Sequence, residues 1–217
     1  MSEYSYKTVY EGGVGEIEEK KSRFIATVIP IESEEEAVDF FNRTKKKYWD
    51  ARHNCSAFTL GRKHELTRCN DDGEPSGTAG RPMLDVLLRE EIHNVAVVVT
   101  RYFGGTLLGT GGLVRAYQGA VQAGLAQSRI ITRDFGQKLS IQTDYTSLGK
   151  IQYILAQAGI TTLDTEYTEG VTIHAMIPCN ELQKIQNAII EGTSGQANME
   201  LGDQVEYAIL DGELIVF

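Results

Sequence analysis

Hydrophobic positions follow two different periods along the chain, and the change of period delimits the predicted elements. Val95–Val99 is a continuous apolar run of mostly β-branched residues, which predicts a strand buried on both faces. Several glycines follow, and from Leu113 onward apolar residues recur at the spacing of an amphipathic helix. We therefore predict a strand, a glycine-rich loop and a helix in succession, with Thr110 as the helix N-cap.

The glycine-rich loop is a candidate anion site. Glycine allows the backbone to approach a ligand closely, and the N–H groups at a helix N-terminus favour an anion. The loop is not a Walker loop, since Thr110 stands where lysine is required, nor a dinucleotide fingerprint, since Val114 replaces the third glycine. A loop that only packs is the other reading. The candidate anion-binding residues are Arg101, Gly104, Gly105, Gly109, Gly111, Gly112 and Arg115.

Residues 7–31 predict two strands around the turn Glu11–Gly13. The second strand is long, and a basic cluster of Lys20, Lys21 and Arg23 interrupts it. This cluster could contact phosphate. A solvated strand edge guarded by lysines explains it equally well.

A capping box of Ser33 and Glu36 predicts the next helix, with Trp49 closing it in the core. Residues 53–60 and 65–70 then predict a β-hairpin. In that hairpin His53, Cys55 and Cys69 could lie near one another. No fourth ligand has usable spacing for zinc, and buried cysteines usually behave as small hydrophobes, so neither a metal nor a cofactor is predicted.

Residues 70–82 form a loop rich in Asp, Gly, Pro and Ser, which favour turns, before a helix that starts between residues 78 and 82. Asp71, Asp72 and Glu74 lie within four residues and could hold Mg²⁺ or bind a hydroxyl group. A capped turn is the alternative. Because that helix leads into the strand Val95–Val99, we expect the three carboxylates to lie beside the glycine-rich loop.

The second part of the chain repeats a regular order of strand, helix, strand, strand, helix and strand, which is the split ferredoxin-like pattern. Asn180 is expected to cap the second helix, and residues 199–209 to form the last strand. Residues 129–136 are interpreted as the connection between domains. The sequence thus predicts an α+β protein with one domain at 1–135 and a βαββαβ domain at 136–217.

The net charge of −9 over 217 residues is unevenly distributed. Residues 1–135 hold 18 basic and 19 acidic side chains, whereas 136–217 hold 3 and 11, so their net charges are −1 and −8. The second domain should therefore repel nucleic acid, and phosphate contacts should fall on local patches of the first. No apolar stretch reaches membrane length, the start does not resemble a signal peptide, and three cysteines without CxxC spacing suit a reduced, cytoplasmic protein.

Four segments resemble motifs of the YigZ/IMPACT family: Lys21–Phe24, Ala51–Cys55, Asp71–Gly80 and Arg101–Gly105. The resemblance implies a first domain related to the second domain of a small-subunit ribosomal protein and to domain IV of elongation factor G. It implies that the second domain is similar to domain V of that factor. Eukaryotic family members are implied to regulate translation by competing for the scaffold that activates an initiation-factor kinase.

The resemblance therefore implies a translation-linked binding protein that contacts the ribosome, RNA or a ribosome-associated protein in the cytoplasm. Besides the glycine-rich loop, the accessory residues would be Lys20, Lys21, Arg23, His53, Asp71, Asp72 and Glu74. The alternative is a hydrolase such as a peptidase acting on proline dipeptides, a label that some relatives carry. A dinuclear peptidase needs carboxylates from several parts of the chain, whereas the candidate acids here cluster in one loop. Ser76 and Cys55 are candidate nucleophiles without a visible base, so binding is favoured over catalysis.

Overall fold

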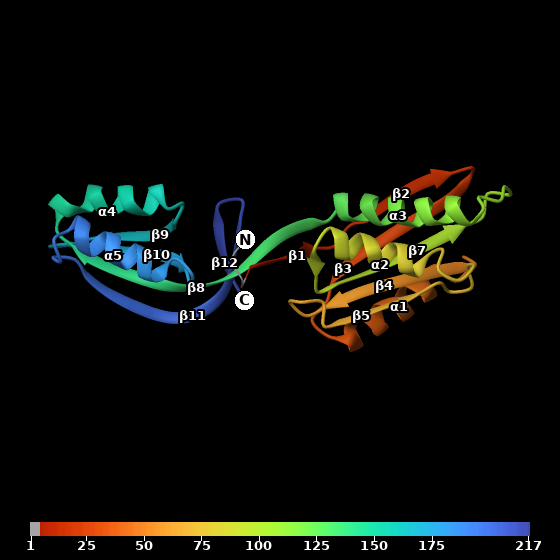
Figure 1. Cartoon of the computed structure of the whole chain (residues 1–217), viewed down its shortest axis with the longest axis horizontal. Coiled ribbons are helices and arrows are strands. Elements are labelled where there is room, and N and C mark those ends of the chain that lie inside the picture. Colours follow the sequence, from red (N-terminus) through yellow and green to blue (C-terminus); the bar gives the residue numbers. More distant parts are fainter. Residues whose placement is uncertain (1–4) are drawn as a thin grey trace. The chain divides into compact units, whose positions relative to one another are not determined.

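The computed structural model describes residues 5–217, which fall into two compact units (Figure 1). One unit is Tyr6–Thr132 and the other contains Arg133–Phe217. Strand β8 (Arg129–Thr143) runs through this division, so residues 129–136 belong to a continuous strand. The domain boundary expected at residues 135 and 136 stays a prediction.

The first unit is built on a five-stranded antiparallel sheet with β7 (Val95–Tyr102) at its centre. Each residue of Val95–Val99 is at most 1% exposed, which confirms the predicted buried strand. Strands β3 and β4 pair with β7, and β2 and β5 form the edges. The other four strands are β2 (Val14–Glu19), β3 (Ser22–Pro30), β4 (His53–Leu60) and β5 (Leu66–Asn70).

Helices cover both faces of this sheet, so apolar residues are needed on both sides of β7. Val97 and Val99 pack in the core formed with α2 (Gly80–Arg89) and α3 (Thr110–Ala126). Ala96 and Val98 pack with the residues of α1 (Glu34–Lys47) on the opposite face. Ser33 is the N-cap as expected, since its Oγ accepts from the Glu36 N–H, while the Glu36 carboxylate accepts from the N–H of Glu32 and not of Ser33. A short parallel pair, β1 (Tyr6–Glu11) and β6 (Ile92–His93), adjoins this unit's core.

The second unit has the predicted ferredoxin-like order of elements. Its antiparallel strands lie in the order β12, β11, β8, β10, β9, and the apolar residues of α4 and α5 pack on one face. The α+β class is thereby confirmed, while the likeness to particular elongation factor G domains stays a prediction. The elements after β8 are α4 (Tyr145–Gln157), β9 (Thr161–Tyr167), β10 (Val171–Pro178), α5 (Leu182–Gly192), β11 (Asn198–Leu210) and β12 (Glu213–Val216).

The long second strand predicted for residues 14–31 is wrong. It is a hairpin of β2 and β3 that turns at Lys20 and Lys21, whose φ angles are 48° and 68°. Two successive residues with positive φ make the tight turn that matches the twist of an antiparallel pair. Neither lysine is a usual residue for this conformation, so the sequence carried no turn signal.

Local details of several helix ends and of the last strand also differ from expectation. Helix α3 begins after Gly109, whose φ is 73°, so Thr110 is its first helical residue and not its N-cap. Glu181 and not Asn180 precedes α5, and β12 follows the strand that was expected to be last. Trp49 is 82% exposed and not in the core, because α1 ends before it and the chain turns toward β4. No helix among the described residues is long and apolar enough to cross a membrane.

Two stacked histidines join the turn after β4 to strand β6. The rings of His64 and His93 lie 3.9 Å apart between centroids at an interplanar angle of 9°. Burial, and secondarily the neighbouring His93, lower the pKa of His64 below its usual 6.5. Protonation of His64 is therefore less favourable in the folded than in the unfolded chain.

We expect the melting temperature to fall as pH drops below about 6.5, because the unfolded state then binds a proton at His64 more readily. Replacement His64→Asn should flatten this dependence, since Asn tolerates the positive φ of 54° at this position. Thermal unfolding between about pH 7.5 and 5.5 measures the effect, with His174→Gln in the other unit as the control. An unchanged slope in His64→Asn would contradict the assignment.

Candidate functional site

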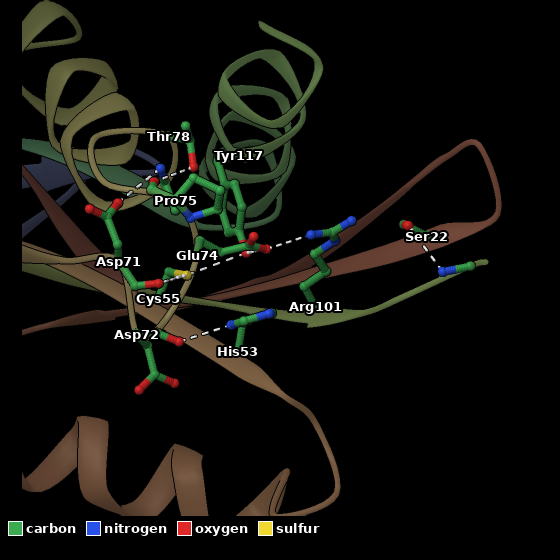
Figure 2. A network of polar contacts seen from close by, with 12 residues as sticks. Ser22, His53, Cys55, Asp71, Asp72, Glu74, Pro75, Thr78, Arg101 and Tyr117 are labelled. Carbon is green, nitrogen blue, oxygen red and sulfur yellow. Dashed lines mark hydrogen bonds and ion pairs between the residues drawn. The ribbon is translucent and has the colours of Figure 1, made fainter. Parts of the chain in front are cut away.

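The buried carboxylate of Glu74 forms hydrogen bonds that connect the loop before α2 with β7 and α3 (Figure 2). Glu74 Oε1 accepts a hydrogen bond from Arg101 Nη1 at 2.6 Å and from the Tyr117 hydroxyl at 2.9 Å. Glu74 lies in the loop before α2, Arg101 near the end of β7 and Tyr117 in α3. The side chains of Arg101 and Glu74 are only 7% and 3% exposed, so this ion pair is buried.

Cys55 extends the network toward the strand β4. Its Sγ lies 3.0 Å from the carbonyl oxygen of Asp71 and 3.3 Å from the Tyr117 hydroxyl. Burial raises the pKa of Cys55 to about 12, and burial also raises the pKa of Tyr117. Cys55 is therefore a neutral thiol near pH 7, a state that is a poor nucleophile.

The carboxylates of Asp71 and Asp72 order the loop that carries them. Asp71 accepts hydrogen bonds from the backbone N–H groups of Gly77, Ala79 and Gly80, where α2 begins. Asp72 accepts from the Asn54 N–H at 2.7 Å and pairs with the Lys45 ammonium at 2.8 Å. These contacts correspond to the capped-turn reading. Across residues 5–217 no three His, Cys, Asp or Glu side chains converge as metal ligands.

His53 lies beside Arg101, because the two residues are direct partners in the pairing of β4 with β7. Its Nδ1 is 2.9 Å from the carbonyl oxygen of Asp72 (Figure 2). A carbonyl oxygen can only accept, so Nδ1 carries the hydrogen and Nε2 has the lone pair in the neutral ring. His53 thus joins the acidic loop to the end of the central strand that carries Arg101.

The glycine-rich loop rests on the turn between β2 and β3, which brings together two of the candidate segments. The Gly104 N–H donates to Ser22 Oγ at 3.1 Å. A Cβ atom at Gly104 would overlap the backbone carbonyl of Lys21, so only glycine allows this approach. Lys20 and Lys21 therefore lie at the base of the loop. Arg23 forms two hydrogen bonds with Glu16, at 2.6 and 2.8 Å, which offset its charge.

The loop is open at Gly105 and Gly109. Gly105 and Gly109 have φ angles of 85° and 73°, and no heavy atom lies within 4 Å of a Cβ built on either. Gly111 and Gly112 form the first turn of α3, which has no side-chain cap. The Arg115 guanidinium reaches back over this turn, with Nη1 3.8 Å from the Cβ position of Gly111.

Sequence reasoning missed three residues of this region. Tyr117 falls on the apolar face of the helix predicted from Leu113 onward, and a buried tyrosine hydroxyl usually needs a hydrogen-bond partner. Phe103 and Leu107 lie in the loop and are 55% and 83% exposed. Their apolar character within a glycine-rich segment was the available signal.

Comparison with known proteins identifies both units. Residues 20–125 match the Impact N-terminal domain, and residues 141–196 match a domain of unknown function, DUF1949. The IMPACT family member YvyE of Bacillus subtilis (strain 168) is 40% identical over 200 residues, which are 92% of this chain and 92% of that protein. The chain belongs to the IMPACT family.

Other similar proteins agree with this assignment. The IMPACT family member YigZ of Escherichia coli (strain K12) is 33% identical over 182 residues, 83% of this chain and 89% of that protein. The Protein IMPACT homolog of Dictyostelium discoideum is 37% identical over 106 residues, 47% of this chain and 30% of its own length. A crystal structure described as that of a hypothetical protein has a TM-score of 0.58 and 31% identity, covering 90% of this chain and 96% of its own. The family resemblance of the four motifs is confirmed.

Proposed function

We propose that this IMPACT family member is a translation-linked binding protein that contacts the ribosome, its RNA or a ribosome-associated protein in the cytoplasm. The observation that supports it best is the cationic surface formed by Lys20, Lys21, Arg115 and the glycine-rich loop. In the described part of the chain none of these three cations has an acidic partner within ion-pair distance. Unpaired cations beside open backbone N–H groups favour an anionic partner.

The distribution of charge indicates which unit makes the contact. The residues after 135 have a net charge of −8, so a polyanion such as RNA would be repelled over most of that unit. The first unit is nearly neutral, and its cations are partly offset, as Arg23 is by Glu16 and Lys45 by Asp72. An anionic partner is therefore expected at the cationic surface defined above.

Arg101 was expected to contact phosphate, but its Nη1 binds Glu74 inside the unit. We therefore propose that Arg101 does not contact the partner directly. It stabilises the end of β7, directly before the glycine-rich loop. The direct contacts are proposed for Lys20, Lys21, Arg115 and the N–H groups of the loop.

The contacts of the acidic loop favour binding over peptide hydrolysis. Asp71 and Asp72 accept hydrogen bonds from backbone N–H groups, and Glu74 is held by Arg101 and Tyr117. Cys55, with its pKa near 12, is protonated at neutral pH. The three carboxylates and Cys55 thus hold the fold, and Ser76 is an exposed residue of the same loop.

Co-sedimentation with purified bacterial ribosomes at several salt concentrations tests the proposal. The double variant Lys20→Asn and Lys21→Asn should bind more weakly and reduce the slope of log K against log salt, by about one for each lysine that contacts a phosphate. Asn keeps the turn because it tolerates positive φ. The matched control is Lys63→Gln with Arg89→Gln, which removes two exposed charges near the opposite end of β7. Equal salt slopes for the two double variants would count against the cationic surface.

A further inference from the structure

The glycine-rich loop carries two exposed apolar side chains in the midst of the cationic surface. Leu107 is 83% exposed and Phe103 is 55% exposed. Single exposed apolar residues are common and need no explanation. This pair differs because both residues lie on one loop whose ends are held by the fold.

Three contacts hold the loop in place. At its start, Gly104 packs on the Lys21 carbonyl and donates to Ser22. The Arg101 guanidinium carbon lies 5.6 Å from the centroid of the Phe103 ring, a cation–π contact that places the ring beside the buried network. At its other end, Leu108 packs against the core of the first unit. Leu107, the neighbour of the anchored Leu108, consequently points to solvent.

A preorganised apolar side chain suits docking, because little conformational freedom is lost when a partner encloses it. Lys20 and Lys21 lie in the turn that contacts one end of the loop, and the Arg115 guanidinium lies at the other end. In residues 5–217 these three cations lack acidic partners. A complementary surface therefore has an apolar pocket with negative charge at its rim.

The chemistry of Leu107 distinguishes between two sources of that negative charge. RNA offers phosphates and base faces, which the cations and the ring of Phe103 can meet, but the more exposed Leu107 has no polar group or ring for either. A protein pocket bordered by Asp and Glu supplies both the apolar cavity and the charge. Interfaces commonly have this arrangement of an apolar centre and a polar rim.

We propose that residues 103–108 dock into an apolar, acid-rimmed pocket of a protein, with Leu107 as the inserted side chain. This inference rests on the proposed ribosome-linked function and names the class of the partner as a protein of, or bound to, the ribosome. The cations around the loop orient the encounter, while Leu107 contributes burial of apolar surface.

The test compares binding of the full chain to purified bacterial ribosomes and to protein-free ribosomal RNA. Replacement Leu107→Ser should weaken ribosome binding by about tenfold or more, because the burial of a leucine side chain is lost. The salt slope should stay the same, since no charge changes. Binding to protein-free RNA should be equal for Leu107→Ser and the unaltered chain.

The matched control is Leu201→Ser, which removes a leucine of the other unit that is 47% exposed. It should bind ribosomes as the unaltered chain does. If Leu107→Ser binds ribosomes normally, or weakens binding to RNA as much as to ribosomes, the docking inference is overturned and the proposed function stands. If the unaltered chain does not bind ribosomes, the proposed function fails and the inference fails with it. Melting temperatures of both variants establish that each is folded.

Discussion

Replacement Arg101→Met is expected to lower the free energy of unfolding of the first unit by about 3–5 kcal/mol, the usual cost of removing one partner of a buried ion pair. Glu74 would remain in the interior with the Tyr117 hydroxyl as its remaining hydrogen-bond donor. An isolated buried carboxylate is far less stable than a paired one, and methionine keeps most of the arginine stem. Urea unfolding followed by circular dichroism measures the loss.

Two further variants show whether the loss comes from the unpaired charge. The double variant Arg101→Met with Glu74→Gln removes both charges and should lose less stability than the single replacements added together. Arg23→Met breaks the exposed pair with Glu16 and should change stability little, because solvent already screens that pair. Additive losses in the double variant would mean that Arg101 and Glu74 are not coupled.

Replacement Gly104→Ala is expected to destabilise the first unit by about 1–3 kcal/mol, the typical cost of forcing an extra methyl group into a packed site. The new Cβ atom would overlap the Lys21 carbonyl, which is backbone and cannot rotate away. The loop must then move off the turn of β2 and β3, and ribosome binding should weaken together with stability. Thermal unfolding and co-sedimentation report the two effects.

Gly111→Ala is the matched control within the same loop and helix start. A Cβ atom there meets only Arg115, at 3.8 Å, and alanine favours a helix over glycine by up to about 1 kcal/mol. This variant should therefore melt at the same or a higher temperature. If Gly104→Ala behaves like Gly111→Ala, the loop does not depend on its contact with Lys21.

The steric requirement falls on Gly104 and not on its neighbour Gly105. A valine at Gly105 would meet open space, so its cost would come from the φ of 85° and not from a clash. Gly104 is the residue whose missing side chain permits the contact between segments. Five glycines in one loop look equivalent in sequence, but among them only Gly104 would place a Cβ atom against the neighbouring hairpin.

The family and most of the elements could be predicted from the amino-acid sequence. The run Val95–Val99 predicted the central strand, because a strand covered on both faces needs apolar residues at consecutive positions. Ser33 and Glu36 predicted a helix start from a contact within one turn. The order of elements after residue 136 predicted the ferredoxin-like sheet, and four motifs indicated the IMPACT family. Each of these signals lies within a short stretch of chain or in the order of such stretches.

The partners of the buried polar residues, by contrast, depend on how distant segments pack together. Glu74 meets Arg101 27 residues away and Tyr117 43 residues away, and Gly104 meets Ser22 across 82 residues. Periodicity and spacing describe neighbours along the chain, whereas these partners are chosen by the packing of β7, α3 and two loops. Packing likewise left Trp49 in solvent and made Glu74 a buried ion-pair partner. The hydrophobic pattern specifies which side of an element is covered, but the partner of a buried charge depends on which distant segment arrives beside it.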